Sequence, residues 1–250
     1  MIYFMYEILK KKFSQNFLVD KNIINKICSE IKYENLNILE IGPGDGRLTE
    51  TIFAFKPKKL LLIEIDPDLI PSLNSKFNHV KNLEIKNQDF LKIDINSHLD
   101  LIISNLPYKI SSQILVKVCL LKKLPQRLIF MFQKEFADRL LDKKLNSLNS
   151  LVNCFFKVKK LFNVSKNCFR PIPKVNSSVL LFDKKDDTLL SEIEVNKYIE
   201  FKRNIFSHKR KTLKNLLKNY DTLRNDIDLT LRVEEIKLGQ LIKIFREVNL

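Results

Sequence analysis

The segment at residues 104–108, Ser-Asn-Leu-Pro-Tyr, combines two carbonyl acceptors, a stiff turn and an aromatic ring. The side-chain carbonyl of Asn105 and the main-chain carbonyl of Leu106 could accept both N–H bonds of an amino group. Pro107 stiffens this turn, and Tyr108 offers a face for base stacking, worth about 1–3 kcal/mol. The combination suits adenine N6, whose lone pair is delocalised into the ring and which needs such acceptors to become nucleophilic. An ordinary turn with a half-buried tyrosine is the alternative.

A second chemical signal is a glycine cluster. Gly42, Gly44 and Gly46 are three of only four glycines in the 250 residues. The apolar run before them, residues 38–41, predicts a short buried strand, and the residues from Arg47 onward predict a helix. A strand, a glycine-rich turn and a helix form the first unit of a nucleotide-binding α/β sheet, with the ligand beyond the carboxyl end of the strand. A tight turn that binds nothing is the alternative here.

Two acidic residues follow at the expected positions for further ligand contacts. Glu64 closes the apolar run that begins at residue 60, and its carboxylate could accept both ribose hydroxyls of an adenosine. Asp89 follows the next strand-like run and could accept from an adenine amino group, with Phe90 beside the ring. Each acid taken alone is more readily explained as a helix cap or a surface carboxylate. Their order after the glycine cluster favours the binding role.

These side chains require alternating strands and helices to position them. Helical spacing occurs at residues 20–31, 69–77 and 111–121, between or before the strand-like runs, which predicts a mostly parallel sheet covered on both faces. Two later runs, at residues 152–160 and 177–182, predict strands that extend the sheet at one edge as an antiparallel pair. The strand-like runs of the parallel part are residues 38–41, 60–65, 83–86, 101–104 and 127–132.

The character of the chain changes after a polar break at residues 183–188. From about residue 190 to the end it has helical periodicity and no strand pattern. We therefore expect an α/β domain over residues 1–184 and a small all-α C-terminal domain over residues 185–250.

Composition limits the classes of protein that are possible. Lys and Arg total 44 against 29 Asp and Glu, a net charge of +15, which suggests a polyanionic partner such as nucleic acid. The abundance of Lys, Asn, Ile and Phe with only two alanines is also what an AT-rich genome produces, so local basic clusters carry more weight than the total.

The cysteines and histidines show no metal-ligand spacing, and the cysteines are expected to be small core residues in a reducing compartment. No apolar run approaches the roughly 18 residues of a membrane helix. The first twelve residues have the reverse of a secretory pattern. We expect a cytoplasmic protein with no metal site and no membrane association.

Together, the glycine cluster, Glu64, Asp89 and residues 105–108 resemble the S-adenosylmethionine-dependent adenine-N6 methyltransferases. Further segments are similar to the ribosomal RNA adenine dimethyltransferases within that group, in the right order along nearly the whole chain. These segments are residues 13–18 (FSQNFL), 133–140 (QKEFADRL), 169–177 (FRPIPKVNS) and 209–213 (KRKTL).

The resemblance implies a Rossmann-like methyltransferase sheet, S-adenosylmethionine as cofactor and S-adenosylhomocysteine as product. It implies that Asn16 and Leu18 line the methionine end of the cofactor, with Asn105 also in contact, and that Phe169 faces the target base opposite Tyr108. The implied activity is N6,N6-dimethylation of two adjacent adenines near the 3′ end of 16S rRNA, in the small ribosomal subunit or its precursor, by a monomeric enzyme of ribosome biogenesis.

RNA should be held mainly by phosphate contacts from basic residues. Lys202, Arg203 and Lys214 are further candidates, although any single lysine is more often a solvated surface charge. The principal candidates are Lys10, Lys11, Lys12, Lys209, Arg210 and Lys211.

The chain departs from the family pattern at residues 145–149, Leu-Asn-Ser-Leu-Asn, where a Tyr-Gly-Arg-Leu-Ser-like stretch is usual. This change bears on the local loop and on RNA docking.

Three other functions remain open. The first is the macrolide-resistance branch, which methylates an adenine of large-subunit rRNA. The second is a non-catalytic RNA-binding assembly factor, which the intact residues 105–108 disfavour. The third is a nicotinamide-dependent oxidoreductase, which explains neither residues 105–108 nor the loop at residues 169–177.

Overall fold

The computed structural model describes residues 16–208, 210–217 and 227–248. Up to residue 155, helices separate most of the consecutive strands of the chain, as the sequence predicts. The strands are β1 (Phe17–Leu18), β2 (Asn37–Ile41), β3 (Lys59–Glu64), β4 (Leu83–Asn87), β5 (Leu101–Asn105), β6 (Arg127–Gln133), β7 (Phe156–Val164), β8 (Phe169–Arg170) and β9 (Ser177–Lys184). The α-helices are α2 (Lys21–Cys28), α3 (Arg47–Ile52), α4 (Ile70–Phe77), α5 (Ser111–Cys119), α6 (Lys134–Leu140), α7 (Ser147–Phe155), α8 (Glu192–Ser207), α9 (Leu213–Leu216) and α10 (Leu238–Val248).

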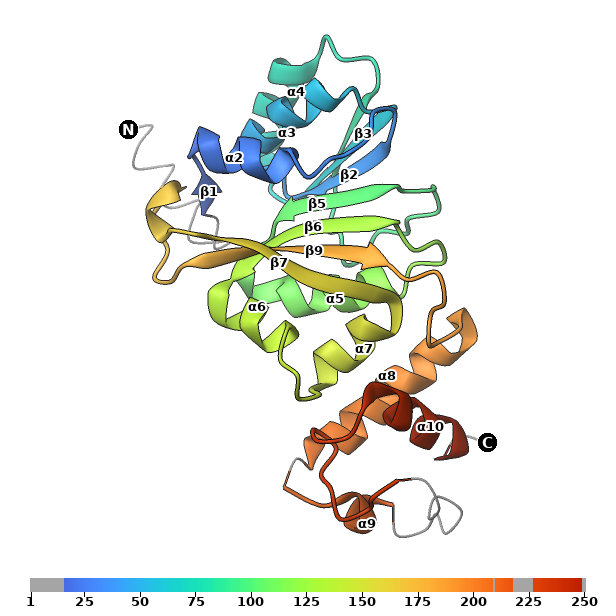
Figure 1. The fold of residues 1–250 in the computed structure, drawn as a ribbon. Coiled ribbons are helices and arrows are strands. Elements are labelled where there is room, and N and C mark those ends of the chain that lie inside the picture. The colour runs from blue at the N-terminus through green and yellow to red at the C-terminus, as the bar shows by residue number, and fades with distance from the viewer. Residues whose placement is uncertain (1–15, 209, 218–226, 249–250) are drawn as a thin grey trace.

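One large sheet organises the molecule (Figure 1). In the described residues its strand order is β4-β3-β2-β5-β6-β9-β7. The strands from β4 to β6 pair in parallel, whereas β9 pairs antiparallel with both β6 and β7. The order reverses between β2 and β5, and such a switch point opens a crevice beyond the carboxyl ends of the strands. The predicted mostly parallel sheet with an antiparallel edge is confirmed.

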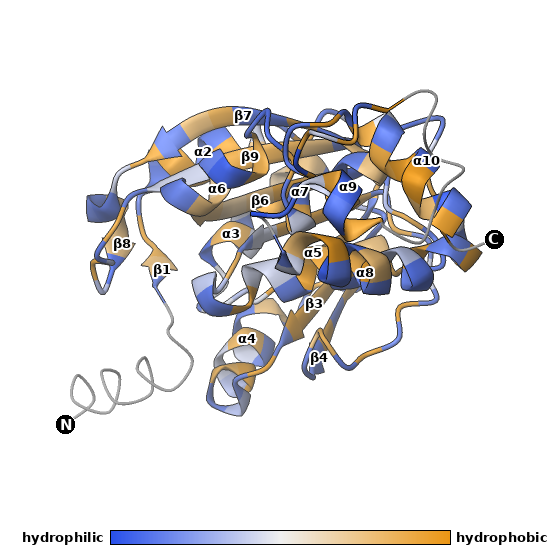
Figure 2. Cartoon of the chain, turned by 90° about the horizontal axis from the view of Figure 1, so that it is seen from below, coloured by the Kyte–Doolittle hydropathy of each residue, from blue (hydrophilic) through white to orange (hydrophobic). Residues whose placement is uncertain are grey.

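Helices cover both faces of this sheet, because alternate strand residues point to opposite sides. On β2, Ile38 packs with α2 and α3, whereas Leu39 packs in the cluster that contains α5 and α7. Figure 2 shows mostly apolar residues along the central strands, and apolar and polar residues interspersed along the helices. Both faces are therefore buried, as expected for parallel strands.

The C-terminal helices continue one of these clusters. Tyr198 of α8 and Phe245 of α10 lie with ring centroids 5.2 Å apart and belong to the same buried cluster as the strand residues. The predicted all-α character beyond the sheet is confirmed, because the described residues after β9 form helices and one isolated bridge, Thr212 with Arg232. The domain boundary at residues 184 and 185 stays a prediction.

One predicted strand is partly wrong. Residues 152–155, expected as the start of a strand at residues 152–160, form the last turn of α7, and β7 begins only at Phe156. The helix is fixed at its start by Asn146, whose side chain accepts from the N–H groups of Leu148 and Asn149, while Asn149 Oδ1 accepts from the Asn146 N–H. Asn146 and Asn149 belong to residues 145–149, which depart from the family pattern. Their reciprocal hydrogen bonds cap the N-terminus of α7, so this stretch forms the beginning of a helix.

A small second sheet was not expected from the sequence. β1 pairs antiparallel with β8, with Phe17 opposite Arg170 and Leu18 opposite Phe169. The two strands lie together at one side of the molecule, away from the C-terminal helices (Figure 2). This pairing brings the N-terminal motif against the loop at residues 169–177, although about 150 residues separate them in sequence.

Candidate active site

The glycine-rich turn joins β2 to α3 and has the backbone conformation that favours glycine. Gly42, Gly44 and Gly46 have positive φ angles of 66°, 60° and 78°. The Gly42 N–H donates to the Ile63 carbonyl at 2.9 Å, which fixes the turn to β3. A Cβ atom added at Gly42 would meet nothing within 4 Å, so the backbone there borders open space that a ligand can enter.

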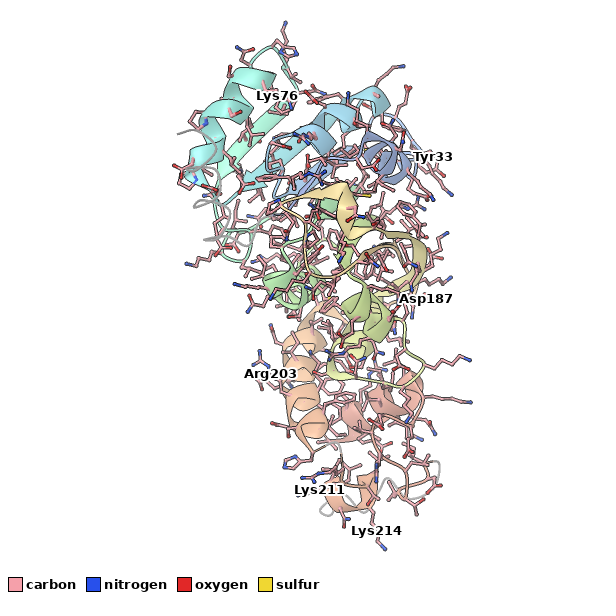
Figure 3. The ribbon with its side chains drawn as sticks, turned by 90° about the vertical axis from the view of Figure 1, so that its left-hand side faces the viewer. Tyr33, Lys76, Asp187, Arg203, Lys211 and Lys214 are labelled. Atoms are coloured by element: carbon pink, nitrogen blue, oxygen red, sulfur yellow. The ribbon has the colours of Figure 1, made fainter. Side chains whose placement is uncertain are left out.

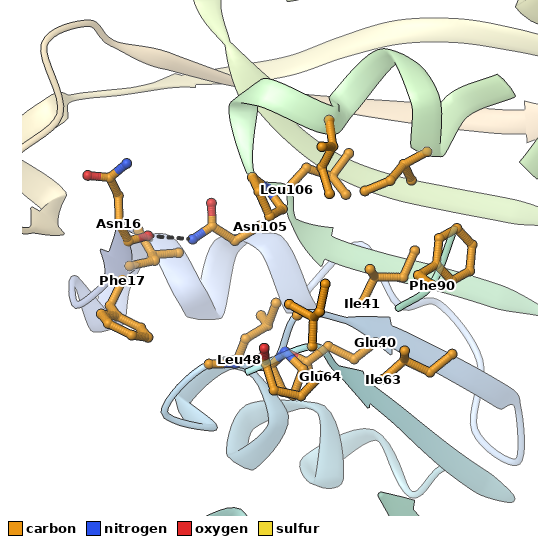
Figure 4. A pocket seen from close by; sticks show the side chains of 18 of the residues that line it. Asn16, Phe17, Glu40, Ile41, Leu48, Ile63, Glu64, Phe90, Asn105 and Leu106 are labelled. Carbon is orange, nitrogen blue, oxygen red and sulfur yellow. Dashed lines mark hydrogen bonds between the residues drawn. The ribbon is translucent and has the colours of Figure 1, made fainter. Parts of the chain in front are cut away.

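A cavity of about 290 Å³ lies beside this turn, at the carboxyl ends of the strands next to the switch point (Figure 4). It collects residues from the N-terminal motif, the glycine-rich turn and the ends of β3, β4 and β5. Most of the predicted site residues line it: Asn16, Leu18, Gly42, Gly44, Glu64, Asp89, Phe90, Asn105, Leu106, Pro107 and Tyr108.

Gly46 has a different role from the one predicted. It does not line the cavity. A Cβ atom there would lie 2.8 Å from the Phe77 ring and 3.2 Å from Leu73, both on α4. Gly46 therefore allows the start of α3 to pack closely against α4, in addition to its positive φ.

Glu64 is the last residue of β3, and its carboxylate supports the glycine-rich turn. Only 2% of the residue is exposed. One oxygen, Oε2, accepts from the Gly44 N–H at 3.1 Å, and Oε1 accepts from the Asp66 N–H at 2.9 Å. Burial raises the pKa of this carboxyl above its ordinary value, and the two N–H donors oppose that rise. Each carboxylate oxygen retains lone pairs for a ligand hydroxyl.

Asp89 and Phe90 lie at the end of the cavity formed by β3 and β4. Asp89 follows β4 by two residues, is half-buried, and accepts from the Leu91 N–H through Oδ1 at 2.9 Å. Phe90 is buried, and Figure 4 shows its ring close to Ile41 and Ile63. The carboxylate and the apolar side chains together can bind a flat ring that carries an amino group.

Asn105, the last residue of β5, is oriented by the N-terminal motif. Its Nδ2 donates to the Asn16 main-chain carbonyl at 2.9 Å, and its Oδ1 points away from Asn16 (Figure 4). No donor in the described part of the chain reaches Oδ1. The side-chain oxygen is therefore available to accept from a ligand N–H.

Tyr108 lines the cavity and is half-buried. Its hydroxyl lies 2.7 Å from Ser177 Oγ. Burial raises the pKa of the Tyr108 hydroxyl, an effect that the contact with Ser177 opposes.

The structure corrects the role predicted for Phe169. This ring is fully buried, packs in the cluster that contains Leu18, Met131 and Val179, and does not line the cavity. The reason is tertiary: the pairing of β8 with β1 turns Phe169 inward, opposite Leu18. Phe169 therefore does not face the cavity in this structure.

Three residues at the site escaped the sequence analysis. Phe17 lines the cavity and covers the turn, since a Cβ atom at Gly44 would lie 2.8 Å from its ring. Lys76 Nζ donates to the Asp45 carbonyl at 3.0 Å and pairs with Glu50 at 2.9 Å, which clamps the turn from α4. Figure 3 labels Lys76 at the end of the molecule opposite the C-terminal helical region.

The third is Glu40, an acid inside the buried strand β2. It lines the cavity, is 1% exposed, and accepts from Thr49 Oγ1 at 2.6 Å. Burial raises the pKa of Glu40 to about 8, and the neighbouring Glu64 adds to the rise. A charged residue within the apolar run of residues 38–41 was the signal in the sequence that could have identified it.

The predicted basic residues fall into three groups. Lys10, Lys11, Lys12 and Lys209 lie outside the described residues. Arg203, Arg210, Lys211 and Lys214 are exposed in the C-terminal helical region; Figure 3 labels Arg203, Lys211 and Lys214 there. The RNA-binding role predicted for Lys202 is corrected by the structure. Lys202 is only 5% exposed, and its Nζ donates to the Ser147 carbonyl at 2.9 Å, which joins α8 to α7.

Cys28, Cys119 and Cys154 are buried, as predicted, whereas Cys168 is half-buried. Within the described ranges, no three His, Cys, Asp or Glu side chains gather as metal ligands do. In those same ranges, no helix is both long and apolar enough to cross a membrane.

Known proteins that this chain resembles in sequence and in structure are named as ribosomal RNA methyltransferases or dimethyladenosine transferases. The ribosomal RNA small subunit methyltransferase A of Mycoplasma mobile is 39% identical over 253 residues, covering 96% of this chain and 98% of its own length. Among solved structures, a dimethyladenosine transferase from Plasmodium falciparum has a TM-score of 0.80 at 27% identity, covering 93% of this chain and 97% of that one. The 23S rRNA methyltransferase ErmE has a TM-score of 0.74 at 26% identity, with 94% and 100% covered.

The match to a defined family spans the sheet, the cavity and the C-terminal helices together. Residues 7–250 match the family described as ribosomal RNA adenine dimethylase. The motifs that line the cavity and the extent of this match lead to one conclusion: the chain belongs to the ribosomal RNA adenine dimethylase family of methyltransferases.

Proposed function

We propose that this enzyme transfers methyl groups from S-adenosylmethionine to N6 of two adjacent adenines near the 3′ end of 16S rRNA, and that it acts on the small ribosomal subunit or its precursor. The observation that carries the proposal is the orientation of Asn105. Its Nδ2 is engaged by Asn16, which leaves Oδ1 as an acceptor at the cavity.

The cavity residues fit the proposed cofactor. Glu64 has lone pairs for two ribose hydroxyls, Asp89 can accept from an adenine amino group, and Gly42 allows close approach of a ligand to the backbone. Asn16 and Leu18 would line the methionine end. When bound, the cofactor supplies a methyl group on a sulfonium, already activated for displacement.

The remaining work of the protein is to position the adenine. Asn105 Oδ1 and the Leu106 carbonyl would accept the two N6–H bonds, and Tyr108 would support the ring after the base leaves its stack. Such positioning can contribute on the order of 7–11 kcal/mol to lowering a barrier. A strong general base is unnecessary, because the methylated nitrogen becomes acidic and can lose its proton to solvent.

Basic side chains in the C-terminal helical region would hold the RNA through phosphate contacts. Arg210 and Lys211 are exposed and close in sequence, which supports this role. Lys10, Lys11, Lys12 and Lys209 remain candidates by sequence alone. A monomeric state and a cytoplasmic location also remain predictions.

The test is transfer of labelled methyl from S-adenosylmethionine to undermethylated 30S subunits, with 50S subunits in parallel. We expect dimethyladenosine in 30S rRNA, and near-complete loss with Asn105→Ala. The similarity to ErmE makes 50S methylation the second candidate, and label found only in 50S rRNA would establish it. Cofactor binding without any transfer would instead indicate a non-catalytic assembly factor.

A further inference from the structure

The contact between Tyr108 and Ser177 joins two segments that are 69 residues apart in sequence. Ser177 is the first residue of β9 and is fully buried. It is paired on both sides, with Gln133 of β6 and with Val164 of β7. Because β9 is interior in the sheet, Ser177 Oγ is a fixed point in the molecule.

Tyr108 is held less firmly by its own segment. It begins the short 3-10 helix η3 (Tyr108–Ile110) directly after Pro107 and is only half-buried at the cavity. The hydroxyl lies on the axis of the ring, so a hydrogen bond to it restrains the swing of the ring about χ1 and leaves the ring flip free. The direction of the ring axis, and with it the place of the aromatic ring in the cavity wall, thus depends on where Ser177 Oγ lies.

We propose that Ser177 is a positioning residue that holds the Tyr108 ring at the angle needed to stack on the target adenine. The inference rests on the proposed function, because it takes an adenine as the occupant beside Tyr108. The burial of Phe169 strengthens it, since the aromatic partner expected opposite Tyr108 is absent from the cavity wall. The orientation of the base then depends more on the Tyr108 ring than it would if Phe169 also faced the cavity.

The same contact connects the cavity to an exposed loop. Residues 171–176 lead directly into Ser177, and Ile172 and Val175 in this loop are 53% and 44% exposed. At the other end of the loop, Arg170 pairs with Phe17, which lines the cavity. The loop is therefore anchored on both sides of the base site, and Ser177 is the anchor that reaches Tyr108.

The experiment is a double-mutant cycle with Ser177→Ala, Tyr108→Phe and the double variant. The matched control is Ser178→Ala, because Ser178 is equally buried and its Oγ donates to Asn163 Oδ1 at 2.7 Å, on the β7 side. Two quantities are measured for each protein: kcat/KM for methylation of 30S subunits, and the fluorescence of 2-aminopurine placed at the target adenine. Stacking on a tyrosine quenches that fluorescence, and 2-aminopurine needs no methyl transfer to report it.

We expect each single variant to lower kcat/KM about three- to tenfold, the range for loss of one hydrogen bond, and to weaken the quenching. The double variant should lose no more than either single one, while Ser178→Ala and the affinity for S-adenosylmethionine stay unchanged. Tyr108→Phe keeps the test decisive if Ser177→Ala folds poorly. Native kinetics and quenching in both single variants, or additive losses in the double variant, would overturn the proposal. Lack of 30S methylation by the native chain would instead count against the proposed function.

Discussion

The side-chain amide of Asn105 donates to the main-chain carbonyl of Asn16 at 2.9 Å, across 89 residues of sequence. A carbonyl can only accept, so this contact sets which end of the amide faces the cavity. The N-terminal motif thereby orients an acceptor on β5, in addition to lining the cofactor cavity.

This relationship predicts that Asn105→Asp damages the enzyme although it keeps a side-chain oxygen. The carboxylate cannot donate to the half-buried Asn16 carbonyl, and loss of a hydrogen-bond partner of this kind costs about 1–3 kcal/mol. We expect methyl transfer to fall roughly 5- to 150-fold. Asn163→Asp is the control, because Asn163 only accepts, from Ser178 Oγ, and Asp can do the same. Native turnover by the Asn105→Asp protein would refute the role given to the amide.

Gly44→Ala should abolish or strongly weaken cofactor binding. The new Cβ would lie 2.8 Å from the Phe17 ring, and the positive φ of 60° costs a residue other than glycine about 1–2 kcal/mol. We expect at least a tenfold loss of affinity for S-adenosylmethionine in a calorimetric titration. Gly239→Ala in α10 is the matched control, since a Cβ there meets nothing within 4 Å. Equal affinities for the two variants would contradict the prediction.

Glu64→Gln should weaken cofactor binding, and because the amide nitrogen cannot accept a hydrogen bond, either the Gly44 N–H or the Asp66 N–H also loses its acceptor. Charge-assisted hydrogen bonds contribute about 1.5–3 kcal/mol each, so we expect affinity to fall about 10- to 100-fold. Glu84→Gln on the neighbouring strand β4 is the comparison, because its carboxylate only forms exposed pairs with Lys59 and Lys86, and such pairs contribute little. If both variants bind the cofactor like the native chain, Glu64 does not contact the ribose.

Glu40 should make stability depend on pH. Its pKa is about 8 in the folded protein against 4.5 ordinarily, so between these values the folded state holds a proton that the unfolded state has lost. The free energy of unfolding must then fall as pH rises through this window, by up to about 1.4 kcal/mol per pH unit. In urea titrations at pH 5.5 and pH 8, without cofactor, Glu40→Gln should lose less stability than the native chain.

The control for this measurement is again Glu84→Gln. Exposed contacts with Lys59 and Lys86 lower the pKa of Glu84, so it stays ionised throughout this range. Its variant should follow the native pH dependence. Parallel curves for the native and Glu40→Gln proteins would mean that Glu40 is ionised in the folded state.

Reversing charge at Arg210 and Lys211 should weaken binding to the ribosomal subunit without affecting cofactor binding. Contacts with RNA phosphates depend on the local positive charge and on salt. We expect KM for 30S subunits to rise at least several-fold at about 0.15 M salt, and the salt dependence to become shallower. Lys58→Glu with Lys81→Glu changes the net charge equally, at exposed positions that precede β3 and β4. A similar KM increase in both double variants would remove the case for a specific contact.

Much of this site could be predicted from the order of residues along the chain. The glycine cluster, Glu64, Asp89 and residues 105–108 each lie at or just after the end of a strand, and the carboxyl ends of parallel strands meet at one edge of the sheet. The turn therefore had to lie near these side chains, and it does. Residues 152–155 were misassigned because their apolar run suits a buried helix as well as a strand, and the cap at Asn146 decided for the helix.

Sequence alone determined the strands of the parallel sheet, most of its helices and their order, because hydrophobic period and glycine conformation are local properties. Only the tertiary structure decided which side chains those ends present to the cavity. The pairing of β1 with β8 buried Phe169, the packing of α4 removed Gly46 from the cavity, and the neighbourhood of Thr49 and Glu64 gave Glu40 its raised pKa. Each of these depends on contacts between residues distant in the chain, which no local pattern encodes.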